Sequence, residues 1–399
     1  MQQLVLEIPE VIGRELHELV MSAGMKVLAK MLEAEREQLC GPRYAHSSSR
    51  KATRGGHAPG ELALGGRRVS VSCPRVRGRE VALRPWDLFA GVDALNERAL
   101  EQMVIGVSTR KYARSLEDVD LKTRGTSKSA ASRRFVALTQ ARLDEMMKAD
   151  LSKIDVAALM IDGIAVGKHV VLVALGIDVD GPKHIIGIHE GATENAAACT
   201  ALLASLRERG MRTDRTILVV IDGSKALRKA VTDVFGNKAV VQRLPGPQEP
   251  KRRRPLPDSM HASVRTAMAQ AYKAKGFAAA RSPRESRALQ KEHPSAAASI
   301  REGLDETLTI KRFKLPDALV RTLSTTNAIE NVNSGIRRVC KRVTTWEGGM
   351  MVLRWVGAAV VEHGRGFRRL RGHAGMGSLV AAVRALDTDL LVAEKEIAA

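Results

Sequence analysis

Two apolar segments of this chain, sixty residues apart, both stop at the dipeptide Asp-Gly. The first is ALMIDGIAV, residues 158–166, and the second is LVVIDGSKAL, residues 218–227. Short apolar runs of roughly four to eight residues bounded by turn residues are typical of buried strands. The chain must therefore build an internal sheet in which two strands end on a carboxylate.

The segments between and around these strands predict their order in the sheet. Strand-like segments cover 156–166, 168–181 and 182–191, a helix covers 193–210, and a strand at 216–223 precedes a helix at 224–236. This β-β-β-α-β-α order predicts an α/β fold of the RNase H-like class, a mixed sheet flanked by helices. In that topology the first and fourth strands are neighbours, so Asp162 and Asp222 are expected to lie side by side.

Two adjacent carboxylates repel each other, and a divalent cation relieves that repulsion. Mg²⁺ prefers hard oxygen ligands and keeps positions open for a substrate phosphate. Two such ions, about 4 Å apart, activate an attacking oxygen and stabilise a leaving oxygen in phosphoryl transfer. We therefore expect Mg²⁺ or Mn²⁺, as two ions, at Asp162 and Asp222. The alternative is that each Asp-Gly is only a turn.

A third acid would complete such a site, and Glu330 is the best candidate. It lies in TTNAIENVNSGIRRVCKR, residues 325–342, which predicts a helix that also carries Arg337 and Arg338. A carboxylate among amides and followed by arginines suits a metal ion and DNA better than a core. The other acids considered for this role lie in turns or at a helix start: Asp178, Asp180, Glu190 and Glu194.

The charge of the chain points to a polyanionic partner. Its 64 Lys and Arg residues exceed its 44 Asp and Glu residues, giving a net charge of +20 and an isoelectric point near 10.2. Nucleic acid is the first expectation and a membrane surface the second. No apolar run is long enough to span a membrane, no signal peptide is evident, and the four cysteines are scattered. We expect a cytoplasmic, nucleoid-associated protein.

The first 150 residues are expected to bind DNA. A helix is predicted at 10–39, a short basic hairpin within 67–84, and helices at 93–106, 108–119 and 126–147. Ser127 can cap the last helix, whose first turns carry five polar or basic residues suited to base edges and phosphates: Lys128, Ser129, Ser132, Arg133 and Arg134. The alternatives are a flexible linker for the hairpin, and a helical hairpin with a solvated basic face.

Several stretches resemble the Mutator-type bacterial insertion-sequence transposases, a DDE family. They are IDG at 161–163, HEGATEN at 189–195, VVIDGSKAL at 219–227, EGLDETLTI at 302–310 and STTNAIENVNSGIRR at 324–338. The resemblance covers roughly residues 90–370. It implies that Asp162, Asp222 and Glu330 form the metal-binding triad of an RNase H-like core. It also implies that a helical insertion fills part of the 108-residue gap between Asp222 and Glu330.

The resemblance also divides the chain into expected regions. Residues 1–88 hold the first helix and basic hairpin, 89–150 a helix-turn-helix-like DNA-binding domain, and 151–375 the catalytic domain with its insertion at about 245–318. Residues 376–399 form a C-terminal helical tail. The implied activity is metal-dependent cleavage of transposon ends and strand transfer to target DNA, by a homo-oligomer on double-stranded DNA and away from any membrane. The rivals are an inactive DNA-binding remnant and an RNase H-like nuclease without strand transfer.

One stretch departs from the family pattern. The family usually shows Q-R-C-x-x-H after the second Asp, whereas this chain reads QRLPGPQEPKRRRPLPDSM at 242–260. Gln242 and Arg243 match, but the Cys and His are absent and four prolines break any helix. Residues 244–255 are either a variant loop or a compensated frameshift, since one permitted codon set read a base later gives C-L-V-H-K-N-R-N-V-A-D-H. A frameshift predicts a misplaced insertion and low or no activity.

Overall fold

The computed structural model describes residues 2–44, 52–64, 67–78, 83, 86, 94–116, 123–191, 195–244 and 306–398. It forms two compact units, Met1–Ala141 and Arg142–Ala399. Most of the predicted insertion, including 245–255, lies outside the described residues. No helix in the described ranges is both long enough and apolar enough to cross a bilayer.

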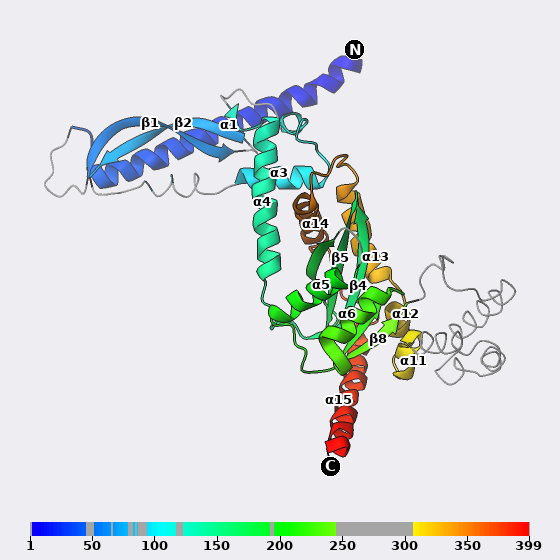
Figure 1. Ribbon diagram of the computed structural model, residues 1–399. Coiled ribbons are helices and arrows are strands. Elements are labelled where there is room, and N and C mark those ends of the chain that lie inside the picture. Colours follow the sequence, from blue (N-terminus) through cyan, green and yellow to red (C-terminus); the bar gives the residue numbers. More distant parts are fainter. Residues whose placement is uncertain are drawn as a thin grey trace. The chain divides into compact units, whose positions relative to one another are not determined.

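The first unit contains a long helix packed on a small antiparallel sheet (Figure 1). Helix α1 spans Gln2–Cys40, and strands β1 (Thr53–Leu64), β2 (Arg67–Arg77) and β3 (Thr123–Arg124) pair in that order. Leu28 and Leu32 of α1 are buried against Leu62 of β1. A hairpin forms from β1 and β2, so the prediction that both of its strands lie within 67–84 is wrong, as is the flexible-linker alternative for 53–64 and 67–77.

The remaining described part of the first unit is mainly helical and packs around one buried tyrosine. Helix α3 spans Ala94–Val104 and α4 spans Lys128–Lys148, where Ser127 Oγ accepts from the Ala130 amide at 3.2 Å and caps the helix as predicted. The helix predicted at 108–119 is wrong over 108–116, because only the single turn η1, Ala113–Ser115, forms there. Tyr112 is fully buried in a cluster with Ala99 and Ala131, and this packing overrides the local helical pattern.

The second unit is built on a five-stranded mixed sheet. Its strands are β4 (Val156–Val166), β5 (His169–Asp178), β6 (Lys183–Gly191), β7 (Ile217–Ile221) and β8 (Ala239–Arg243). The order across the sheet is β6-β5-β4-β7-β8, with β4, β5 and β6 antiparallel and β7 parallel to both β4 and β8. The first and fourth strands of this unit are therefore neighbours, as the sequence predicted.

Helices cover the sheet and complete the unit. Helices α5 (Ala196–Glu208) and α6 (Lys225–Phe235) share one apolar core with alternate residues of β4 and β7. After the undescribed stretch come α11 (Thr309–Arg312), α12 (Asp317–Leu323), α13 (Asn327–Cys340), α14 (Gly349–Gly364), the turn η3 (His373–Gly375) and α15 (Met376–Ala398). The helix predicted at 325–342 is confirmed as α13, which is two residues shorter at each end.

Candidate active site

The register of the sheet places the two aspartates on neighbouring strands. Asp222 directly follows β7, but Asp162 lies within β4, which continues to Val166, so the prediction that the first strand ends at its carboxylate is wrong. Ile161 of β4 pairs with Ile221 of β7 in the parallel ladder, and Asp162 and Asp222 are the residues that follow them. Both Asp side chains are half-buried. Because successive side chains of a strand alternate between faces, Asp162 points away from the α5–α6 core into which Ile161 is packed. The predicted adjacency of the two strands that carry the aspartates is confirmed.

Each aspartate is oriented by a backbone amide beside it. Asp162 Oδ1 accepts from the Gly163 amide at 2.9 Å, and Asp222 Oδ1 accepts from the Ser224 amide at 3.0 Å. Ser224 in turn caps α6, because its Oγ accepts from the Leu227 amide at 3.3 Å. The turn at Asp222-Gly223 therefore does not only connect β7 to α6. It also fixes the Asp222 carboxylate next to the start of that helix.

Asn333 is the site residue that sequence reasoning did not single out. Its side chain is only 1% exposed, and its Nδ2 donates to Asp162 Oδ2 at 2.8 Å. Its Oδ1 is buried and has no partner among the described residues. One signal was present: Asn333 falls four residues after Ile329 and three before Ile336, within the buried stripe of α13. An amide at a core position needs a polar partner.

Glu330 lies one turn before Asn333 on α13. It is exposed, and its Oε1 accepts a hydrogen bond from the hydroxyl of Thr326 at the start of the helix. Residues three apart lie on the same side of a helix, so Glu330 and Asn333 share one face. No group of three or more acidic, His or Cys side chains is gathered at metal-binding distance within the described ranges. The structure therefore joins Asn333 to Asp162, places Asp222 on the neighbouring strand, and leaves Glu330 hydrogen-bonded to Thr326.

The donor set fits a hard divalent cation. Asp162 within β4 and Asp222 just after β7 would supply carboxylate oxygens, and magnesium in proteins takes such oxygen ligands together with water and phosphate. Residues that do not touch a metal ion often hydrogen-bond to one of its ligands and hold that ligand in one orientation. The hydrogen bond from Asn333 to Asp162 is of this kind. The residue types at this position therefore fit a divalent cation, with Asp162 and Asp222 as the residues that would hold it.

The expected DNA-contacting residues differ in their surroundings. Lys128, Ser129 and Arg133 are exposed on the first turns of α4, and Ser132 is half-buried. Arg134 is half-buried and donates through Nη1 to the Gly125 carbonyl, so it also holds the turn before α4. On α13, Arg337 and Arg338 are exposed.

Gln242 joins the two ends of the chain that flank the undescribed stretch 245–305. It is 1% exposed on β8, and its Nε2 donates to the Thr307 carbonyl at 2.7 Å. Its Oε1 accepts from the Ile310 amide at 2.9 Å. Arg243 beside it donates through Nη2 to the Gly223 carbonyl at 3.1 Å, next to Asp222. The Gln-Arg pair thus ties the returning chain to the β7–β8 edge of the site.

Comparison with known protein families identifies the chain. Residues 5–369 match the family described as "Transposase, Mutator family". The chain belongs to the Mutator family of transposases. The resemblance seen in the sequence is confirmed, and the match covers both structural units.

Curated relatives of this transposase come from several bacteria. The transposase for insertion sequence element IS256 in transposon Tn4001 of Staphylococcus aureus is 25% identical over 355 residues, covering 84% of this chain and 87% of that protein. The transposase for IS1081 of Mycobacterium tuberculosis is 25% identical over 380 residues, covering 90% and 88%. The transposase for IS6120 of Mycolicibacterium smegmatis is 29% identical over 240 residues, covering 58% and 72%.

Proposed function

We propose that this transposase is a DDE enzyme with an RNase H-like core, which cleaves the ends of its element and joins them to target DNA as a homo-oligomer on double-stranded DNA. The observation that carries the proposal is the pairing of Ile161 with Ile221, because Asp162 and Asp222 are the residues that follow this pair on the two parallel strands. The order and pairing of the strands support the RNase H-like assignment.

In the proposed mechanism the three acids are the metal ligands. Asp162, Asp222 and Glu330 would hold Mg²⁺ or Mn²⁺, which would supply charge stabilisation for an attacking and a leaving phosphate-ester oxygen. Asp162 is kept in place by the amide of Asn333. Glu330, whose Oε1 accepts from the Thr326 hydroxyl, would supply the third carboxylate. The +20 net charge supports a DNA substrate.

The triad is tested by three single substitutions. Asp162→Asn, Asp222→Asn and Glu330→Gln should each lower Mg²⁺-dependent cleavage of the element's end by at least about 100-fold, because each removes charge where it is needed in the transition state. Binding of the same DNA should change little. Asp233→Asn is the matched control, since Asp233 is an exposed acid of α6 paired with Lys229 at 2.6 Å.

The outcome separates the transposase from its two rivals. Cleavage that survives in any one of the three variants rejects that residue. Absence of cleavage in the unmodified protein favours the DNA-binding remnant, and cleavage without joining of the new 3′ end to a second DNA favours the nuclease.

DNA recognition is tested separately on α4. Replacing Lys128 and Arg133 with alanine should weaken binding of the element's end and lower the slope of log affinity against log salt by about 1.8, for two phosphate contacts. Adding Arg134→Ala should weaken it further, partly because the bond to Gly125 that holds the turn is lost. Unchanged binding by the triple variant would move the DNA contact elsewhere, most simply to the β1–β2 hairpin.

A further inference from the structure

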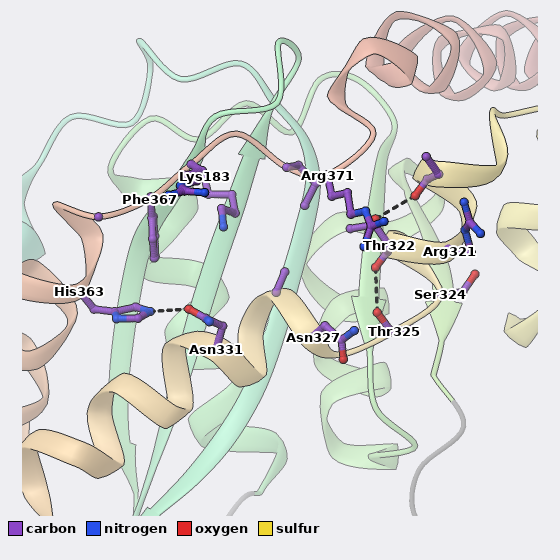
Figure 2. A pocket seen from close by; sticks show the side chains of 15 residues that line it. Lys183, Arg321, Thr322, Ser324, Thr325, Asn327, Asn331, His363, Phe367 and Arg371 are labelled. Carbon is purple, nitrogen blue, oxygen red and sulfur yellow. Dashed lines mark hydrogen bonds between the residues drawn. The ribbon is translucent and has the colours of Figure 1, made fainter.

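A cavity of about 790 Å³ lies beside α13, within the second unit. It is bounded by α12, by the first turns of α13, by the start of β6 and by the chain that follows α14 (Figure 2). The residues that line it and are used below are Lys183, Arg321, Asn327, Asn331, His363, Phe367, Arg368 and Arg371.

The cavity is lined by positive charge without any acid. One lysine and three arginines contribute to its wall, and none of its lining residues is Asp or Glu. The four cations are Lys183, Arg321, Arg368 and Arg371. None of them forms an ion pair with an acidic side chain in the described part of the chain. Burial lowers the pKa of the Lys183 ammonium, which marks a cation that lacks a compensating charge. Such a wall favours a ligand with several negative charges.

An aromatic group stands among these cations. The Lys183 ammonium lies 4.9 Å from the centre of the Phe367 ring, and the His363 ring meets the same ring edge-on with the centres 5.5 Å apart. His363 Nε2 is 2.7 Å from Asn331 Oδ1. Burial first, and then the charges of Arg338 and Lys183, lower the pKa of His363, so the neutral ring donates to Asn331 through Nε2–H. A positively charged groove with an aromatic wall is how single-stranded nucleic acid is held.

The same helix serves the cavity and the candidate active site. Asn327 and Asn331, four residues apart, line the cavity, whereas Asn333 bonds to Asp162. An α-helix with its side chains is about 10–12 Å across. A ligand in the cavity is therefore separated from Asp162 by about the width of α13, which is short enough for one polynucleotide strand to reach both.

We infer that this cavity holds one strand of DNA, with its phosphates on the arginines and a base or sugar against Phe367, next to the phosphate that is cleaved. The inference rests on the proposed function for its orientation toward Asp162. Its volume is that of a cavity for a drug-sized ligand, so a lone inorganic anion would leave most of it empty.

The experiment measures binding of a dye-labelled oligothymidylate of about 12 nucleotides to the full chain carrying Asp162→Asn, which prevents cleavage. Arg321→Ala and Arg371→Ala should each lower the slope of log affinity against log salt by about 0.7, the value for one phosphate contact on a single strand. Arg369→Ala is the matched control. Arg369 is exposed in the same loop, two residues from Arg371, and does not line the cavity.

The aromatic wall is tested by two substitutions at one position. Phe367→Tyr should bind the oligothymidylate as the parent does, and Phe367→Leu should bind it roughly 5- to 100-fold more weakly, because stacking is lost while an apolar side chain remains. Unchanged thermal unfolding of Phe367→Leu distinguishes a contact with the strand from a role in folding. In addition, photo-crosslinking of an iodouridine-containing oligonucleotide should label the peptide that contains His363 and Phe367.

Several results would overturn the inference. Equal salt slopes for Arg371→Ala and Arg369→Ala would mean that the cavity holds no phosphate. Displacement of the oligonucleotide from the crosslinked site by equimolar inorganic phosphate would reduce it to a simple anion site, and equal displacement by polyglutamate would make it a site for acidic peptides. If the unmodified protein shows no Mg²⁺-dependent cleavage, the proposed function is rejected, but the binding results at the cavity are unaffected.

Discussion

Replacing Gln242 with leucine should loosen the chain that returns to the β7–β8 edge after residue 305. Leucine has a similar volume but neither donates nor accepts, so three hydrogen bonds disappear. They run to the Thr307 carbonyl at 2.7 Å, to the Arg243 carbonyl at 3.1 Å and from the Ile310 amide at 2.9 Å. Each is worth about 1 kcal/mol net, and buried partners left unpaired raise the cost. We expect the second unit to lose about 3 kcal/mol of unfolding free energy.

The assay can be confined to the second unit. The chain has three tryptophans, and of these Trp346 and Trp355 lie in the second unit, in edge contact with ring centres 6.5 Å apart. In a Trp86→Phe background, their fluorescence follows urea unfolding of that unit alone. A loss of about 3 kcal/mol lowers the urea midpoint by about 1 M when the m-value is near 3 kcal/mol/M. The Ile310 amide should also exchange its proton faster, because its acceptor is gone.

Two further variants decide whether hydrogen bonding is the cause. Gln242→Glu keeps the volume but sets a carboxyl oxygen against the Thr307 carbonyl, so it should be at least as unstable as leucine at neutral pH. Asn237→Leu makes the same amide-to-apolar change at an exposed position shortly before β8 and should cost less than about 0.5 kcal/mol. If leucine shifts the midpoint no more than the Asn237 control does, Gln242 does not anchor the returning chain.

Substitutions of two other residues, Asn333 and Asp387, test metal binding and the dependence of stability on pH. Asn333→Ala should weaken metal binding at Asp162 by roughly 10- to 100-fold, measured by Mn²⁺ titration, whereas Ser334→Ala, on the exposed side of α13, should have no effect. Burial raises the pKa of Asp387, but its hydrogen bonds from Lys238 at 2.7 Å and from Thr216 outweigh burial and hold it below the ordinary value. Its contribution to stability is therefore present above about pH 4 and lost as pH falls further. Asp387→Asn should flatten that loss in thermal unfolding between about pH 2 and 5, and an unchanged profile would assign the loss to other acids.

The sequence predicted the part of the site that strands position, because strand patterns are strong there. Continuous apolar runs predicted β4 and β7, and the order of the elements along the chain predicted that these two strands are neighbours. Helix α13 was predicted from its amphipathic period. In each case local propensity and burial favour the same structure.

Strand β1 shows why other parts could not be predicted. Its sequence TRGGHAPGELAL is rich in glycine and proline and is typical of a loop, yet it pairs with β2 over nearly its whole length. The pairing depends on α1, which buries Leu62 from outside the strand. Tyr112 shows the converse, since its burial prevents a helix that the local pattern favours. The effect of residues 245–255 on activity stays a prediction, because they lie outside the described ranges.

Helix α13 connects the cavity and the aspartates mechanically as well as by proximity. Its stripe of buried residues locks it against the sheet, and Asn333, within that stripe, holds Asp162. On another side Asn331 holds His363, whose ring lies 2.7 Å from where a Cβ on Gly335 would be. A packed helix moves as one body rather than bending at each contact. A DNA strand that shifts His363 and Asn331 would therefore also act on the bond that orients Asp162, so strand binding and carboxylate geometry cannot vary independently.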